Sequence, residues 1–205
     1  MRRDTGPSWL ISDDEAYLLQ LALYVRDACQ LVVAMHPSIP PLQPPIAPIA
    51  SELAAVNKTE AAEQWNAWWQ ERLQQHLTAT NTGDLNAAYA FPDFAALAHS
   101  PDLQASLRLC FRQAVDWINA RMREFIPSIL SANQAGIERE VVRELEHERG
   151  RPVEAFRLRV ISLPVQGKHA WSLTPSCAIM SYAFRFDAAL YRTWLRAAVA
   201  AVAFR

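Results

Sequence analysis

Glycine is scarce in this chain, with only 5 in 205 residues. Loops that wrap tightly around a nucleotide or another cofactor rely on glycine, because only glycine adopts positive φ at little cost. The sequence also lacks the Gly-x-Gly-x-x-Gly, Gly-x-Ser-x-Gly and His-Glu-x-x-His motifs. These absences argue against a nucleotide-dependent enzyme, and we expect the protein to have no cofactor.

Cysteine is also rare, and Cys29, Cys110 and Cys177 lie far apart with no metal-binding spacing. An odd set of separated cysteines is typical of a reducing compartment. The N-terminal segment has no apolar stretch behind its two arginines and so predicts no signal peptide. The longest apolar run, Ala197–Phe204, is much shorter than the ~20 residues that span a bilayer. We therefore expect a cytoplasmic protein with no membrane partner and no metal.

Lysine is nearly absent, since only Lys58 and Lys168 accompany the arginines. Together with abundant alanine, this pattern indicates codon bias in a GC-rich bacterial genome rather than selection for phosphate binding. The net charge is −1, and acidic residues interrupt the arginines of the second half of the chain. The charge pattern therefore disfavours nucleic acid as a partner.

The two halves of the chain carry opposite charge. Up to Ser100 there are 5 Lys and Arg against 11 Asp and Glu, and from Pro101 onward there are 15 against 10. We favour attraction between the halves within one fold. The alternative is a dipolar subunit that associates with a charged partner or with itself.

Proline, by contrast, is concentrated, with six prolines in residues 37–48. Proline fixes φ and lacks an N–H group, so this stretch excludes both helix and sheet. A polyproline II conformation rises ~3.1 Å per residue and would make a stiff strap of roughly 35–40 Å. We expect residues 37–50 to form this extended strap within a single globular domain that spans residues 1–205.

Helical periodicity dominates the rest of the chain. Ser12 to Glu15 has the form of a capping box, followed by apolar residues three and four apart, which predicts a helix over residues 12–36. The same spacing predicts further helices over residues 51 or 59 to 80, 84–90, 93–98, 101–127 and 133–149, and a last helix from Asp187 to Phe204.

The pattern changes near the C-terminus. Phe156–Val160 alternates between apolar and polar residues, and Ile179–Phe186 is rich in β-branched and aromatic residues, so both predict strands. Residues 164–175 between them are expected to be a connection. The predicted fold is α+β and predominantly α-helical, with five to six helices, a small C-terminal two-stranded antiparallel hairpin and the proline-rich strap.

Three tryptophans, Trp65, Trp68 and Trp69, lie within little more than one helical turn. One helical stripe cannot bury all three equally, so we expect one of them at the rim of the core. An exposed tryptophan is typical of a partner-binding surface. The favoured alternative is that the proline strap covers it.

Two pairs of residues are candidates for catalysis. Glu144 and His147 have the Glu-x-x-His spacing of carboxylate-bridged metal sites, but the chain contains no second such pair, which favours a solvated helix face. Cys177 and His169 could act as nucleophile and base if the fold brings them together. We favour a buried, inert Cys177, and we assign no catalytic or metal-binding residue.

The sequence favours the function of a non-enzymatic protein that binds another protein or itself, such as an accessory, regulatory or immunity-type subunit. The alternative is an enzyme with an unrecognised, metal-dependent or thiol-dependent site around Glu144 and His147 or around Cys177 and His169. A third class is a small-molecule sensor with an apolar pocket lined by Trp117, Phe125 and Trp194.

Overall fold

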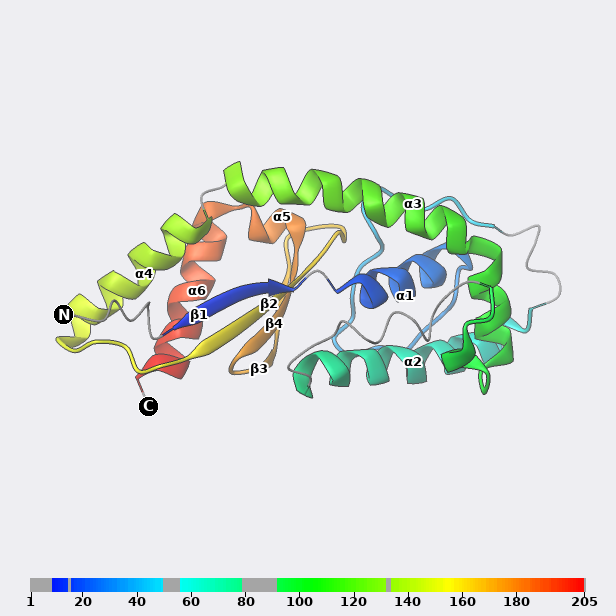
Figure 1. Ribbon diagram of the computed structural model, residues 1–205, viewed down its shortest axis with the longest axis horizontal. Coiled ribbons are helices and arrows are strands. Elements are labelled where there is room, and N and C mark those ends of the chain that lie inside the picture. Colours follow the sequence, from blue (N-terminus) through cyan, green and yellow to red (C-terminus); the bar gives the residue numbers. More distant parts are fainter. Residues whose placement is uncertain (1–8, 15, 50–55, 79–91, 132–133, 205) are drawn as a thin grey trace, which may run out of the picture. The chain divides into compact units, whose positions relative to one another are not determined.

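The structure is a computed structural model that describes residues 9–14, 16–49, 56–78, 92–131 and 134–204 (Figure 1). The chain divides into two compact units. Unit 1 comprises residues 1–15, 123–163 and 167–205, and unit 2 comprises residues 16–122 and 164–166. This division does not test whether the two units fold together, so the expected single domain stays a prediction.

Unit 1 contains a four-stranded mixed sheet with the strand order β1-β2-β4-β3. The central strands β2 and β4 are parallel, β1 pairs parallel with β2, and β3 pairs antiparallel with β4. The bounds are Leu10–Asp14 for β1, Arg157–Leu163 for β2, Ala170–Thr174 for β3 and Cys177–Ser181 for β4. The fold is α+β and largely helical as predicted, but the two-stranded antiparallel hairpin is wrong, because β2 and β4 pair in parallel and the sheet also includes β1 and β3.

The N-terminal strand replaces the predicted capping box. Leu10–Asp14 pairs in register with residues 157–161 of β2, so Ser12 lies in a strand. Helix α1, Tyr17–Ala28, begins later, and Ala16 at its N-cap makes no side-chain capping hydrogen bond. Glu15 lies outside the described residues. The local spacing of residues 12–15 indicated a helix start. It gave no sign of a strand, because the strand that pairs with β1 lies far away in the sequence.

Two helices cover one face of this sheet (Figure 1). They are α4, Gln134–Arg149, and α6, Ala188–Ala203, and both carry an apolar stripe at helical spacing. The stripes pack on alternate residues of β2 and β4 to form the core of unit 1, which includes Val141, Leu145, Leu158, Val160, Ala178, Met180, Tyr191, Leu195 and Val199.

The predicted second strand ends early. β4 stops at Ser181, and the next residues form the short helix α5, Tyr182–Arg185. The Ser181 hydroxyl oxygen accepts a hydrogen bond from the Phe184 N–H at 3.2 Å, which caps this turn. Aromatic residues alone had favoured a strand as far as Phe186, but the serine cap turns the chain.

Unit 2 is helical. It contains α1, α2 (Lys58–Thr78), the 3₁₀ turn η4 (Ala95–Leu97) and most of α3 (Pro101–Ser131), which continues through Pro127 instead of ending there. The predicted helix over residues 84–90 lies outside the described residues. Among the helices that the structure describes, each is too short or too polar to cross a membrane.

The proline-rich stretch has neither helix nor strand over residues 37–49, as the prolines require. It does not run as a straight strap, however. The Ile49 N–H donates to the Ala28 carbonyl oxygen at 2.9 Å, so the chain returns to the end of α1. Proline fixes φ but leaves ψ open, and side-chain contacts bend the segment into a closed loop. We call residues 29–49 the proline-rich loop.

Candidate functional site

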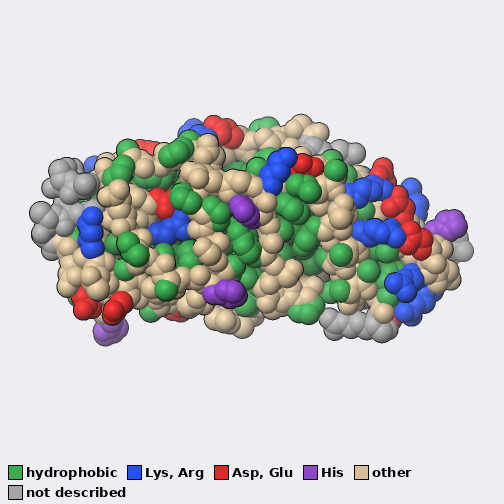
Figure 2. All heavy atoms as spheres, turned by 180° about the vertical axis from the view of Figure 1, so that it is seen from behind, with side chains coloured by type: hydrophobic (Ala, Val, Ile, Leu, Met, Phe, Trp, Pro, Cys, Tyr) green, Lys and Arg blue, Asp and Glu red, His purple; other side chains and the backbone are tan. Residues whose placement is uncertain are grey.

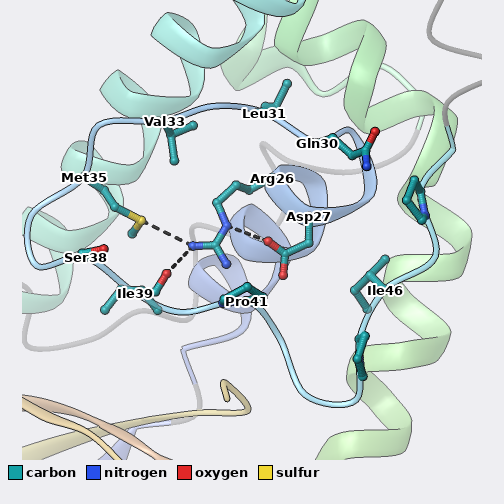
Figure 3. A pocket seen from close by; sticks show the side chains of 12 residues that line it. Arg26, Asp27, Gln30, Leu31, Val33, Met35, Ser38, Ile39, Pro41 and Ile46 are labelled. Atoms are coloured by element: carbon teal, nitrogen blue, oxygen red, sulfur yellow. Dashed lines mark hydrogen bonds and ion pairs between the residues drawn. The ribbon is translucent and has the colours of Figure 1, made fainter. Parts of the chain in front are cut away.

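A pocket of about 490 Å³ opens within the proline-rich loop of unit 2 (Figure 3). This volume lies within the usual range of ligand pockets. Most of the side chains that line it are apolar: Leu31, Val33, Met35, Ile39, Pro41, Pro45, Ile46 and Pro48. The polar side chains in its wall are Arg26, Asp27, Gln30 and Ser38.

Arg26, in the last turn of α1, organises the loop from inside. Figure 3 shows its guanidinium pointing across the loop toward Met35 and Ile39. Arg26 Nη1 donates to the Ile39 carbonyl oxygen at 2.7 Å, and Nη2 donates to the Pro40 carbonyl oxygen at 2.9 Å. Because a proline-rich segment forms neither helix nor sheet, its carbonyl groups lack regular hydrogen-bond partners. The buried guanidinium supplies donors for two of these carbonyl groups.

Asp27 completes this arrangement. One carboxylate oxygen accepts from Arg26 Nε at 2.7 Å, and the other accepts from the Leu42 N–H at 2.7 Å. The two charges of the pair therefore compensate each other within the pocket wall. The charged groups of Arg26 and Asp27 are satisfied within the loop, so they present no uncompensated charge to a group that enters the pocket.

The loop also presents apolar surface to solvent. Val32 is 93% exposed, the largest exposure among the large hydrophobic residues that the structure describes. Pro41, Pro44, Pro45 and Pro48 are exposed as well. Because hydrogen bonds fix the loop, these side chains lose little conformational freedom when they contact another molecule.

The three predicted partner-binding tryptophans are all buried. Trp65 and Trp69 are 0% exposed and Trp68 is 3% exposed, so the expectation that one lies at the rim is wrong. Trp65 Nε1 donates to the Ala22 carbonyl oxygen at 2.6 Å, and the Trp65 and Trp69 rings stack at 5.4 Å. All three fit because α2, which packs against α1, buries a broad face that also includes Ala62 and Leu73. Their role in partner binding stays a prediction.

Unit 1 contains a buried polar cluster that the sequence did not indicate. Arg185 is fully buried and makes two hydrogen bonds to Asp13, at 3.1 and 2.8 Å. It also donates to Gln134 Oε1 at 2.7 Å and to Glu138 Oε1 at 3.1 Å. The Tyr191 ring lies 3.8 Å from the guanidinium carbon, and the Tyr191 hydroxyl donates to Glu138 at 2.7 Å.

Burial and charge shift the pKa values in this cluster. Burial raises the pKa of Glu138, and the hydrogen bond from Tyr191 and the charge of Arg185 reverse this only in part. Burial alone would lower the pKa of Arg185, but the hydrogen bond to Asp13 and the electrostatic interactions with Tyr191, Asp13 and Glu138 together outweigh it, so the pKa is raised and the side chain stays charged. With its donors engaged in this way, the cluster acts as a structural cross-link between β1, α4 and α5.

Glu144 and His147 lie on the exposed face of α4. Glu144 forms ion pairs with Arg192 and Arg196 of α6, and Glu140 and Glu148 extend the same ladder of charges. Within the described ranges, no group of His, Cys, Asp and Glu side chains is placed to hold a metal ion. Glu144 is therefore engaged in helix packing, as the solvated-face interpretation expects.

Cys177 and His169 are not brought together. The Ser181 N–H donates to the His169 carbonyl oxygen at 2.9 Å, which places His169 opposite Ser181, while Cys177 begins the same strand four residues earlier. At ~3.3 Å per residue, the two are about 13 Å apart along the strand. Burial raises the pKa of the Cys177 thiol to about 11, which favours the neutral thiol.

The three aromatic residues of the predicted sensor pocket each pack against a neighbouring ring. Trp117 meets Tyr24 edge-on at 6.0 Å, Phe125 stacks on Tyr182 at 4.4 Å, and Trp194 stacks on Tyr191 at 6.1 Å. Because each ring packs against a neighbouring ring, we interpret the three side chains as packing residues.

Basic and acidic side chains both appear on the face shown in Figure 2, and acidic side chains lie beside several of the basic ones. A nucleic-acid surface would instead gather basic residues into a patch or stripe. Comparison of the chain with protein-family models, with curated proteins and with solved structures finds no match. The functional argument therefore rests on the geometry of the loop.

Proposed function

We propose that this chain is a non-enzymatic protein of the bacterial cytoplasm that binds another protein, and that the proline-rich loop is its binding surface. The observation that carries this proposal is the combination of an open pocket, most of whose lining residues are apolar, with internal hydrogen bonds that fix its wall. The Arg26 guanidinium holds the Ile39 and Pro40 carbonyl oxygens, so the pocket wall can keep its shape when a partner contacts it.

The partner fits this surface through apolar contacts. The pocket has room for a large apolar side chain, and exposed Val32 and the exposed prolines provide surface around it. The one ion pair in the wall, Arg26 with Asp27, is internally neutral. We therefore expect binding that depends little on salt, because few charges are screened when the complex forms.

The tryptophans support this role indirectly. Trp65 anchors α2 to α1 through the Ala22 carbonyl oxygen, and the last turn of α1 contains Arg26 and Asp27, which fix the loop. A direct contact of Trp65, Trp68 or Trp69 with a partner would require α2 to move, since all three are buried. We therefore assign the three tryptophans a packing role that supports the binding surface.

Site-specific photo-crosslinking tests this function. A photoreactive phenylalanine analogue replaces Val32, and in a matched control it replaces Leu130, which is 74% exposed in unit 1. In cells that naturally make the protein, we expect one discrete adduct from position 32 and none from position 130. The Asp27→Ala change should weaken the adduct at position 32. Equal adducts at both positions, or none at either, would refute the proposal.

The enzymatic alternative gains no support from the placement of its residues, since Glu144 is paired with arginines and Cys177 is distant from His169. Metal analysis of protein purified without chelator tests it separately. Stoichiometric zinc, iron or manganese would reverse the order of the two proposals.

A further inference from the structure

One stretch of the proline-rich loop alternates in exposure like a strand, although it belongs to no strand of the sheet. The even-numbered residues between 32 and 38 are exposed, whereas the odd-numbered residues between 31 and 39 are buried or half-buried. A period of two is typical of an extended backbone with one inward face. Figure 3 shows the side chains of Val33 and Met35 directed toward the interior of the loop, where they line the pocket. We call residues 32–36 the extended segment.

The backbone of the extended segment has no hydrogen-bond partner among the residues that the structure describes. It takes part neither in the strand pairs nor in the backbone hydrogen bonds of the loops and turns. The bonds that fix the loop lie on either side: the Leu31 N–H donates to the Arg26 carbonyl oxygen at 2.9 Å, and Arg26 donates to the Ile39 carbonyl oxygen. The N–H and carbonyl groups of the extended segment are therefore open to pairing over roughly 16 Å, at ~3.3 Å per residue.

The extended segment has the composition of a strand that is ready to pair. Val32 and Val33 are β-branched, which favours a pleated backbone. Exposed strand edges are commonly protected by charged residues, by proline or by a bulge. Residues 31–36 contain no Asp, Glu, Lys, Arg or Pro, and the first proline is Pro37. An edge without such protection can accept a further strand, and the main-chain hydrogen bonds then supply affinity.

We propose that the partner binds by adding an extended strand of its own along residues 32–36, with a large apolar side chain of that strand in the adjacent pocket. This inference rests on the proposed function and specifies how the same surface binds. Side chains that lie opposite each other on paired strands are about 5 Å apart. A partner strand therefore places every second side chain beside Val33 and Met35, over the pocket. Because the charges of Arg26 and Asp27 compensate each other, uncharged side chains fit these positions.

Cross-link mapping at three positions tests this mode of binding. The photoreactive phenylalanine analogue replaces Val32, Ala34 or His36 in the full-length chain, each of which is exposed, and mass spectrometry locates the attached residue of the partner. We expect all three positions to give adducts with one protein, within one short stretch of its sequence. From position 32 to position 36 the attachment should advance in one direction by about four residues, because paired strands have the same rise per residue.

The two proposals fail in different ways. If position 32 gives a discrete adduct but the three attachments come from separate parts of the partner's sequence, or do not advance along it, strand addition is wrong and protein binding at this loop stands. The absence of an adduct from all three positions would refute both proposals. An adduct with a second copy of this chain would also refute both, because the partner is proposed to be another protein.

Two proline variants give a second readout. Successive N–H groups of a strand point to opposite edges, so Val33→Pro and Ala34→Pro each remove a donor from a different edge. With the analogue at position 36, we expect one of these variants to lower the adduct yield about fivefold through the lost hydrogen bond. The matched controls Val33→Ile and Ala34→Val keep the N–H and should give the wild-type yield. Thermal unfolding verifies that each variant folds, and the mapping at three positions does not depend on them. Wild-type yields from both folded proline variants would overturn strand addition.

Discussion

Arg185 is a charged side chain with no exposed surface, so its guanidinium relies entirely on partners inside the protein. Asp13, Glu138 and Gln134 accept its hydrogen bonds, and Tyr191 covers its face. A buried ion pair contributes little net stability compared with apolar residues of the same shape, but loss of one partner leaves the others buried without compensation.

We predict that Arg185→Met lowers the free energy of unfolding by about 3–5 kcal/mol, because the Asp13 and Glu138 carboxylates lose their counter-charge. Urea denaturation followed by circular dichroism measures the change. The matched control is Arg192→Met in α6, whose ion pairs with Glu140 and Glu144 are exposed and should cost less than about 1 kcal/mol. Equal losses in the two variants would show that the Arg185 cluster does not act as a cross-link.

Glu138 makes the stability of unit 1 depend on pH. Its pKa is raised above the ordinary value of 4.5, chiefly by burial. The folded state therefore favours the protonated carboxyl, and the resulting stability is fully present below pH 4.5 and is lost as pH rises through the raised pKa. In Glu138→Gln this dependence disappears. We predict that the free energy of unfolding of the wild type, relative to that of this variant, falls as pH rises from 4.5 through the raised pKa of Glu138. A difference that is constant or grows with pH would contradict the assignment.

At the scale of elements, the proline-rich loop depends on Asp27 at the end of α1. The Asp27 carboxylate accepts from both Arg26 and the Leu42 N–H. We predict that Asp27→Ala speeds hydrogen exchange of the Leu42 amide, because that N–H loses its acceptor. The Tyr191 amide in α6, which donates to the Asp187 carbonyl oxygen, is the internal reference and should not change. Unchanged exchange at Leu42 would mean that the loop is fixed by other contacts.

Elements differed in how well local sequence predicted them. α2, α4 and α6 follow apolar stripes with clear ends, such as Asp187, whose carboxylate accepts from the Ala189 and Leu190 N–H groups at 3.1 Å. β1 and β3 were missed, because a strand is stabilised by partners that the local sequence does not contain. β1 finds its partner in β2, more than a hundred residues away.

At the scale of the whole molecule, the opposite charges of the two halves of the chain bear on association. We predict that light scattering gives the mass of a monomer at both low and high salt, because we expect the opposite charges of the two halves to attract each other within one fold. The Glu144→Ala variant, which breaks the exposed ladder, serves as a control and should also be monomeric. A dimer that dissociates with salt would show instead that the charges meet between subunits.

The sequence by itself determined the helical character of the chain, the alternation of β2 and the absence of regular structure across the prolines. These features depend on local propensities and on the period of apolar residues, which a single sequence displays. Tertiary structure alone decided the four-stranded sheet, the burial of all three tryptophans and the closure of the proline-rich loop around Arg26. Each of these depends on contacts between residues that are remote in sequence or on side-chain hydrogen bonds to the backbone, and neither leaves a periodic signal in the sequence.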